Sequence, residues 1–151
     1  MKSFSLFTVV SLFVIVLSST SCKNDKYADW KLLNESWLEK HKTDPGFVQT
    51  ESGLCYKVIH QGVMRSPNSE SVVKVNYTGT LIDSTEFDSG TYYSYLSTTI
   101  DGWQEILPKM KGGSRYIIYV PSDLGYGADG SGDIPPYSTL IFEIELVDSF
   151  Y

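Results

Sequence analysis

The spacing of apolar residues predicts one helix near the start of the chain. Trp30, Leu33, Trp37 and Leu38 recur at intervals that place them on one stripe of a helix. The turn-forming segment 43–46 ends this pattern. Two tryptophans on the stripe indicate that the helix packs against the rest of the protein.

After residue 53 the period of the pattern changes to two. Alternating apolar and polar side chains predict half-buried strands. The predicted strands cover residues 54–60, 72–81, 115–120 and 140–147. In the last of them, Glu143 and Glu145 mark the solvent face, so Phe142 is expected to point inward.

A short second helix interrupts this β-rich half. Asp101 is expected to cap it, and Gln104, three residues later, would complete a capping box. Pro108 and the glycines at 112–113 limit it to about two turns. Its buried stripe is expected to contain Trp103, Ile106, Leu107 and Met110. The whole pattern predicts an α+β fold, in which an antiparallel β-sheet wraps around one short α-helix and a short N-terminal helix precedes it.

The first residues have the layout of an export signal. Lys2 supplies a positive start, residues 4–17 form an uncharged apolar run, and small residues 18–21 precede Cys22. The run is short for a stable membrane span. We therefore expect residues 1–21 to be a signal peptide, residues 22–50 to be a tether with the short helix, and residues 51–151 to be the main domain.

Cys22 follows small residues in a way that resembles a lipobox, so its thiol is expected to be acylated. Ordinary signal cleavage after residue 21 would leave the same first residue, and an uncleaved anchor is a third alternative. If Cys22 carries lipid, Cys55 has no partner within the chain, whereas a Cys22–Cys55 disulfide is open otherwise. Two cysteines and two distant histidines predict no metal site.

Charge and length narrow the class of protein. The 151 residues suffice for one domain with a core. The formal charge of −6 becomes −7 when Lys2 leaves with the signal peptide, and an acidic chain without a basic patch argues against nucleic acid as a partner. We expect a monomeric body. We also expect no cofactor and no covalent catalysis, because no phosphate-binding loop or nucleophile motif occurs. Eleven tyrosines, seven phenylalanines and three tryptophans instead point to an aromatic site.

Four segments between Ser52 and Asp148 form an ordered set of motifs. They are SGLCYKVIHQG (52–62), VVKVNYTGTLIDSTEFDSG (72–90), TIDGWQEILPKMKGGSRYIIYVPSDLGYG (99–127) and IPPYSTLIFEIELVD (134–148). In order and in spacing they resemble consecutive blocks of the FKBP-type peptidyl-prolyl isomerases. The resemblance implies an FKBP-like fold and catalysis of rotation about X–Pro bonds without a metal or cofactor.

The resemblance also implies a hydrophobic cleft beneath a flap formed by residues 125–137. Tyr77 and Phe87 would form one side of this cleft, Ile134 its rim and Phe142 a wall. Trp103 would be the floor under the proline ring of the substrate, although its position on the helix also suits plain core packing.

Three further groups are implied as catalytic by the same resemblance. The carboxylate of Asp88 would lie at the cleft edge, the backbone N–H of Ile100 would bind a substrate carbonyl, and the Tyr126 hydroxyl would be a second donor. Asp88 also suits a turn, and Tyr126 also suits anchoring of its loop.

The chain departs from the family pattern at the rim. The segment 87–100 is short, and either Tyr93 or Tyr95 is expected to replace a phenylalanine of the pocket. The flap between Tyr126 and Ile134 is also slightly short. These changes concern substrate preference and the affinity for the family's macrolide inhibitors more than the fold.

The resulting hypothesis is a lipid-anchored prolyl isomerase of the cell envelope that acts on exported, proline-containing polypeptides. Its lipid is expected in the outer membrane, with the domain in the periplasm or at the surface. The alternatives are a non-catalytic chaperone or peptide-binding module on the same fold, and an adhesin or carbohydrate binder that uses exposed tyrosines.

Overall fold

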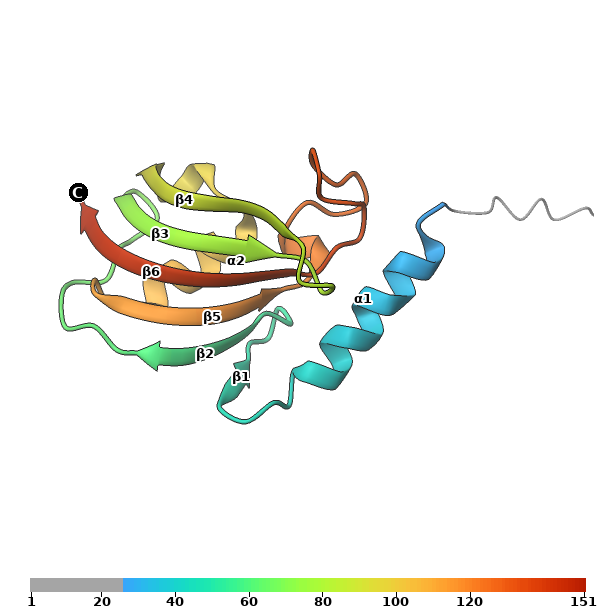
Figure 1. The fold of residues 1–151 in the computed structure, drawn as a ribbon. Helices are drawn as coiled ribbons and strands as arrows, with labels where there is room; N and C mark the ends of the chain where they lie inside the picture. Colours follow the sequence, from blue (N-terminus) through green and yellow to red (C-terminus); the bar gives the residue numbers. More distant parts are fainter. Residues whose placement is uncertain (1–25) are drawn as a thin grey trace, which may run out of the picture.

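The computed structural model describes residues 26–151. The expected signal peptide and Cys22 lie outside these residues. Within them, the chain forms a six-stranded antiparallel sheet, two α-helices and three short 3₁₀ turns (Figure 1). The predicted α+β fold is therefore confirmed.

The sheet has the strand order β1-β2-β5-β6-β3-β4. Its strands are β1 (Phe47–Gln49), β2 (Cys55–His60), β3 (Val72–Thr80), β4 (Glu86–Tyr95), β5 (Ser114–Val120) and β6 (Leu140–Phe150). The helices are α1 (Ala28–His41) and α2 (Asp101–Ile106), and the 3₁₀ turns are η1 (Leu96–Thr98), η2 (Leu107–Lys109) and η3 (Ser122–Leu124). Because β1 pairs with β2, the sheet begins upstream of residue 51, where the main domain was expected to start.

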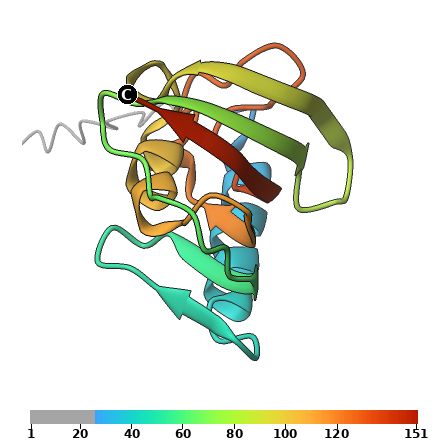
Figure 2. The ribbon, with the colours of Figure 1, turned by 90° about the vertical axis from the view of Figure 1, so that its left-hand side faces the viewer.

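The sheet curves around α2, as Figure 2 shows. The predicted stripe of α2 and η2 is buried, with Trp103, Ile106 and Leu107 in contact with the inner face of the sheet. The faces alternate as predicted, since Val75 and Ile144 are buried on the inner face while Glu143 and Glu145 are exposed on the outer face. One core therefore lies between α2 and the sheet.

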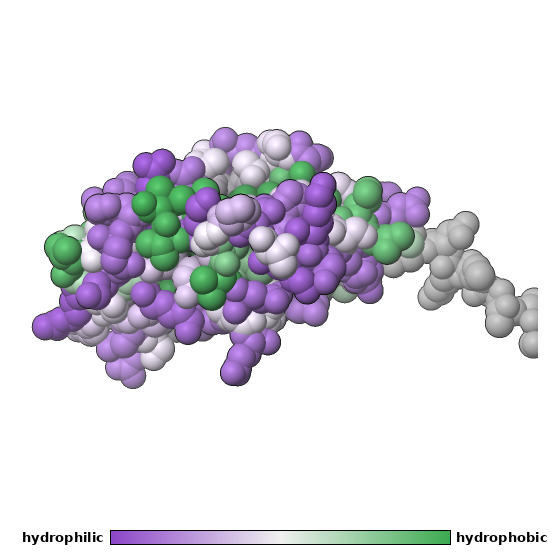
Figure 3. Space-filling model, turned by 90° about the horizontal axis from the view of Figure 1, so that it is seen from below, coloured by the Kyte–Doolittle hydropathy of each residue, from purple (hydrophilic) through white to green (hydrophobic). Residues whose placement is uncertain are grey.

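The outer surface is mainly hydrophilic. Figure 3 shows one face of the molecule, on which the hydrophobic areas are separate and surrounded by polar residues. None of the helices within residues 26–151 is long and apolar enough to cross a bilayer.

Strand β4 was not predicted from the sequence, although it pairs with β3 along its whole length. It lies at the edge of the sheet, and seven of its ten residues are exposed. An edge strand of this kind has little apolar alternation, and this is the signal on which the other strand predictions depended.

The predicted capping box at Asp101 is wrong. Asp101 is the first residue of α2, the extended residue Ile100 precedes it, and no side chain caps the helix end. The Gln104 side chain donates instead to the carbonyl of Thr99, at 2.7 Å. The helix thus starts one residue earlier than a capping Asp101 requires.

The inner face of α1 also differs from the predicted stripe. Leu33 is exposed, whereas Asn34 is only 1% exposed and faces the domain together with Trp30 and Trp37. Trp30 donates a hydrogen bond to Ser138, and Trp37 packs edge-on against Tyr119 with ring centroids 4.9 Å apart. The expected packing of both tryptophans on the domain is confirmed, but a hydrogen-bonded asparagine takes the place expected for a leucine.

Candidate active site

A cleft of about 330 Å³ opens on the inner side of the sheet, where β3, β4 and β6 meet the start of α2. Aromatic side chains form much of its wall, and a few polar groups lie among them. It is lined by Tyr77, Asp88, Tyr92, Thr98, Thr99, Ile100, Trp103, Tyr126 and Phe142. Six of the ten predicted protein site residues therefore come together in one place.

Trp103 is the centre of the aromatic wall. The rings of Tyr77, Tyr92 and Phe142 approach it at interplanar angles of 81°, 87° and 73°, with centroids 5.2, 5.9 and 5.4 Å away. Such edge-to-face pairs favour a fixed arrangement of the rings. Trp103 is only 5% exposed, so most of its surface belongs to the core and a small part faces the cleft.

Phe87 lies behind this wall and does not line the cleft. Its ring packs edge-on against Phe142, with centroids 5.5 Å apart. Both rings cover Gly79, where an added Cβ would lie 2.5 Å from an atom of the Phe87 ring. The glycine of the NYTG motif therefore provides the space for these two rings.

The polar edge of the cleft is formed by Tyr77 and Asp88. The Tyr77 hydroxyl donates a hydrogen bond of 2.6 Å to the Asp88 carboxylate. Burial, this hydrogen bond and the negative charge of Asp88 together raise the pKa of Tyr77 to about 12. Burial, with a smaller contribution from the charge of Asp88, also raises the pKa of Tyr126. Both phenols are thus held in the neutral, donating form.

The backbone N–H of Ile100 and the hydroxyl of Tyr126, both at the cleft, have no acceptor among the described residues. The buried indole N–H of Trp103 has none either. Ile100 has extended backbone angles immediately before α2 and precedes the first turn of the helix. An unpaired N–H and an unpaired hydroxyl at the edge of an apolar cleft are suited to a ligand carbonyl.

The tyrosine of the cleft on β4 is Tyr92, and the expectation of Tyr93 or Tyr95 is wrong. Tyr93 and Tyr95 are 63% and 57% exposed and do not line the cleft. Side chains alternate along a strand, and Tyr92 pairs with the buried Val75 whereas Tyr93 pairs with the exposed Lys74. The sequence could not decide this point because it did not reveal β4 or its register.

The structure also adds two hydroxyl residues to the cleft, Thr98 and Thr99. The Tyr92 hydroxyl lies 2.6 Å from the Thr98 hydroxyl, which in turn bonds the carbonyl of Tyr95 at 2.7 Å. This connection joins the end of β4 to η1 beside the cleft. No pattern in the sequence pointed to it, because Thr98 precedes the motif that begins at Thr99 and Tyr92 lies in a strand that was not predicted.

Ile134, within the flap segment, has its side chain buried in the core and does not line the cleft. Its backbone N–H and carbonyl both bond Ser131, at 2.8 and 3.0 Å, which closes a tight turn within the flap. A contact between Ile134 and a substrate therefore stays a prediction.

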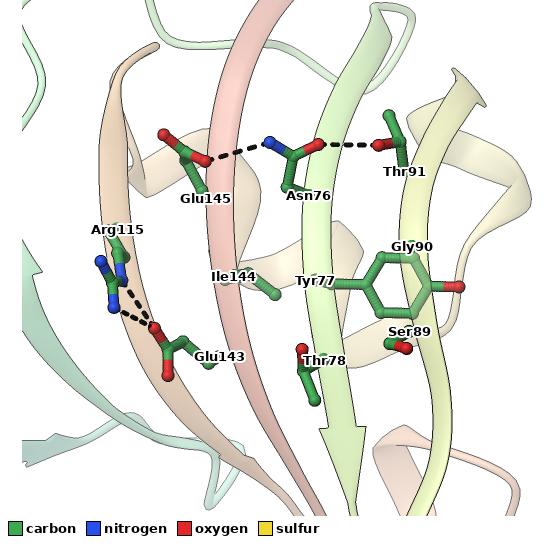
Figure 4. Close-up of a pocket in the computed structure, with 10 residues that line it drawn as sticks. All are labelled: Asn76, Tyr77, Thr78, Ser89, Gly90, Thr91, Arg115, Glu143, Ile144 and Glu145. Carbon is green, nitrogen blue, oxygen red and sulfur yellow. Dashed lines mark hydrogen bonds and ion pairs between the residues drawn. The ribbon is translucent and has the colours of Figure 1, made fainter.

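A second hollow, of about 460 Å³, lies on the outer face of the sheet (Figure 4). Its polar groups are paired with one another: Arg115 with Glu143, and Asn76 with both Glu145 and Thr91. Figure 4 also shows Tyr77 extending from β3 across to Gly90 of β4. With its charged groups already paired and Tyr77 as its one aromatic lining residue, this hollow offers less than the inner cleft for an apolar ring.

The part of the chain that the structure describes contains no group of three or more His, Cys, Asp or Glu residues placed to hold a metal ion. Cys55 is a buried free cysteine, and burial raises the pKa of its thiol. Its pairing with Cys22 is not tested, because Cys22 lies outside the described residues.

The family model of the FKBP-type peptidyl-prolyl cis-trans isomerases matches residues 64–147. The chain therefore belongs to this family. The match contains every residue that lines the inner cleft.

Named relatives and solved structures agree with this assignment. The chain is 42% identical over 130 residues to the outer membrane protein MIP of Legionella longbeachae, covering 82% of this chain and 56% of the relative. It is 38% identical over 139 residues to the FKBP-type peptidyl-prolyl cis-trans isomerase FkpA of Escherichia coli K12, covering 88% and 52%. The chain thus spans about half the length of these curated relatives.

The fold is likewise similar to crystal structures of family members. FkpA from Escherichia coli superposes with a TM-score of 0.78 at 36% identity, over 81% of this chain and 60% of that one. A peptidyl-prolyl cis-trans isomerase from Pseudomonas syringae pv. tomato DC3000 also gives 0.78, at 30% identity, over 83% and 96%. The similarity to the second structure covers nearly its whole length.

Proposed function

We propose that this protein is a peptidyl-prolyl cis-trans isomerase that accelerates rotation about X–Pro bonds in exported polypeptides. The observation that carries the proposal is the inner cleft, in which Trp103 is surrounded by three aromatic rings and faced by unpaired donors. Family membership supports the same activity.

The reaction needs neither a nucleophile nor a proton transfer. Resonance in the peptide bond produces a rotation barrier of about 18–20 kcal/mol. Uncatalysed exchange about an X–Pro bond takes roughly tens to hundreds of seconds. The twisted transition state has lost amide resonance and is less polar than the planar amide, so an apolar cleft disfavours it less than water does. Each 1.4 kcal/mol or so of such differential stabilisation increases the rate about tenfold.

The cleft residues would divide this task between them. The proline ring would lie against the exposed part of Trp103, between the rings of Tyr77 and Phe142. The Ile100 N–H and the Tyr126 hydroxyl would donate to substrate carbonyls, which holds one side of the bond while the other side turns.

Asp88 would act electrostatically on the twisted bond. When the nitrogen no longer donates electron density, the carbonyl carbon becomes more positive, and a nearby carboxylate stabilises it. The hydrogen bond from Tyr77 orients this carboxylate at the cleft edge. Asp88 is therefore proposed as a catalytic residue and Tyr77 as a residue that both contacts substrate and orients Asp88.

The cell envelope is the proposed location. The signal-like residues 1–21 and the lipobox-like Cys22 support export and lipid attachment, and one relative is named an outer membrane protein. Slow prolyl isomerisation limits the folding of many chains, so a catalyst is useful where exported proteins fold. Mass spectrometry of the mature N-terminus would test the anchor, and an unmodified Cys22 thiol would contradict it.

The activity itself is tested with the full-length protein, purified in mild detergent, and a proline-containing peptide whose cis-to-trans exchange is followed directly. We expect exchange faster than in buffer at micromolar protein, and inhibition by a macrolide of the rapamycin class. Absence of acceleration would reject the isomerase. Saturable binding of the peptide without acceleration would instead support the non-catalytic peptide-binding module.

A further inference from the structure

Helix α1 lies before the residues that match the family model, yet it is hydrogen-bonded to Ser138 and Thr139, which directly follow the loop that carries Tyr126. This loop, residues 125–137, is called the flap loop below. It begins after η3 and leads through Ser138 and Thr139 into β6. In Figure 1 it lies at the same end of the sheet as α1.

The first link runs through the indole of Trp30. Its Nε1–H donates to the Ser138 hydroxyl at 2.9 Å, and that hydroxyl donates to the carbonyl of Pro135 at 2.7 Å. Ser138 is buried, so these bonds are shielded from water. One side chain of α1 is thus connected to the second half of the flap loop.

The second link runs through Asn34, the most buried side chain of α1. Its Oδ1 accepts from the backbone N–H of Thr139 at 2.7 Å, and its Nδ2 donates to the carbonyl of Trp30 at 2.8 Å. A buried amide with both ends bonded fixes two backbones relative to each other. Here it fixes α1 relative to the point where the flap loop enters β6.

The third link runs from Lys31 through Tyr137 to Gly127, the residue that follows Tyr126. The Lys31 ammonium lies over the Tyr137 ring, 4.9 Å from its centroid. Tyr137 has a φ of +63°, which is uncommon for a residue other than glycine, and its N–H donates to the carbonyl of Gly127 at 2.8 Å. The two halves of the flap loop are therefore tied together directly beside Tyr126.

We propose that Trp30 and Asn34 are positioning residues for the cleft. Through Ser138 and Thr139 they hold the flap loop in place, so that the Tyr126 hydroxyl stays at the cleft edge before a substrate arrives. A loop that is already ordered loses less conformational entropy when a ligand binds. The expected catalytic effect rests on the proposed isomerase function, whereas the ordering of the flap loop does not.

The test compares three single variants of the full-length protein with one control on the same helix. Trp30→Phe removes the indole donor and keeps an aromatic ring, Ser138→Ala removes the acceptor, and Asn34→Ala removes the buried amide. Leu33→Ala changes a side chain of α1 that is exposed, and serves as the control.

Two readouts separate the ordering of the flap loop by α1 from the isomerase activity. Hydrogen exchange is measured at the amides of Gly130, Tyr137 and Thr139, and needs no enzymatic activity. We expect faster exchange there in the three variants, with no change in β3 and β5. In the isomerase assay we expect KM to increase and kcat/KM to fall by up to about tenfold, with a smaller change in kcat.

A double variant tests the Trp30 link itself. If the effect of Trp30→Phe passes through Ser138, the combination with Ser138→Ala will be no worse than the stronger single variant. The proposal is overturned if exchange in the flap loop matches that of Leu33→Ala, or if it rises equally throughout the sheet. Unchanged KM alongside faster exchange would reject the effect on the cleft. If no variant or wild-type protein shows activity, the exchange data still decide whether α1 orders the flap loop.

Discussion

Tyr77 and Asp88 lie on neighbouring strands and are joined by a hydrogen bond of 2.6 Å. Each of them pairs with a glycine: Tyr77 opposes Gly90, and Asp88 opposes Gly79. Because neither opposing position carries a side chain, the phenol can extend from β3 across Gly90 of β4 (Figure 4) and reach the Asp88 carboxylate. The two glycines therefore make this polar edge possible beside an otherwise aromatic cleft.

The carboxylate is the first site for a test by mutation. Asp88→Ala is expected to lower kcat/KM by about tenfold, because a favourable charge near the twisted bond is lost. The side chain is exposed, so stability is expected to change by less than about 1 kcal/mol. The cis-to-trans assay and circular dichroism measure the two effects. Glu143→Ala removes an exposed carboxylate on the outer face, and an equal loss of activity there would show that the effect of Asp88 is not local.

Alkaline titration tests the environment of Tyr77. An ordinary phenol loses its proton near pH 10, whereas the pKa of Tyr77 is raised to about 12. Between these values the unfolded chain releases a proton that the folded chain retains, so this contribution to stability is complete below pH 10 and is lost as pH rises toward 12.

Absorbance of tyrosinate in wild type and in Tyr77→Phe isolates the group. We expect the difference curve to contain one phenol that titrates near pH 12. A difference curve centred near pH 10 would contradict both the raised pKa and the hydrogen bond to Asp88.

The assignment of Tyr92 to the cleft gives a comparison within one strand. Tyr92→Ala removes a ring that contacts Trp103 and is expected to lower kcat/KM by about tenfold or more. Tyr93→Ala and Tyr95→Ala alter exposed rings outside the cleft, and both are expected to remain within about twofold of wild type. Larger losses from either of the exposed residues than from Tyr92 would contradict the register of β4 at the cleft.

Phe142 belongs to both the cleft and the core, so its truncation is expected to affect folding. It is 3% exposed and contacts the rings of Trp103 and Phe87. Phe142→Ala is expected to reduce the free energy of unfolding by about 3–5 kcal/mol, measured with denaturant. Phe142→Leu keeps most of the volume and is the better variant for activity. A loss below about 1 kcal/mol in Phe142→Ala would show that this ring is not part of the core.

Much of the fold could be read from local patterns. Strands β3 and β6, and the first part of β5, have one buried and one more solvated face, so their side chains alternate in the sequence itself. Strand β2 was also predicted, although its side chains pass from buried to exposed along the strand. Trp103 and its helix were likewise evident, because a buried helical stripe repeats within two turns. The motif resemblance also named residues that the structure brings together, including Tyr77, Asp88 and Tyr126.

Other features depended on contacts between distant parts of the chain. The choice of Tyr92 over its neighbours is set by the pairing of β4 with β3, and an exposed edge strand leaves little trace of its register in the sequence. Asn34 lies outside the apolar stripe predicted for α1, yet its amide oxygen accepts from a backbone N–H that is 105 positions away. Sequence periodicity thus determined both helices and four of the six strands of the described residues, because burial of one face is a local property. The tertiary structure alone decided which side chains meet at the cleft and the flap loop, because those distances follow from strand register and from how α1 packs on the sheet.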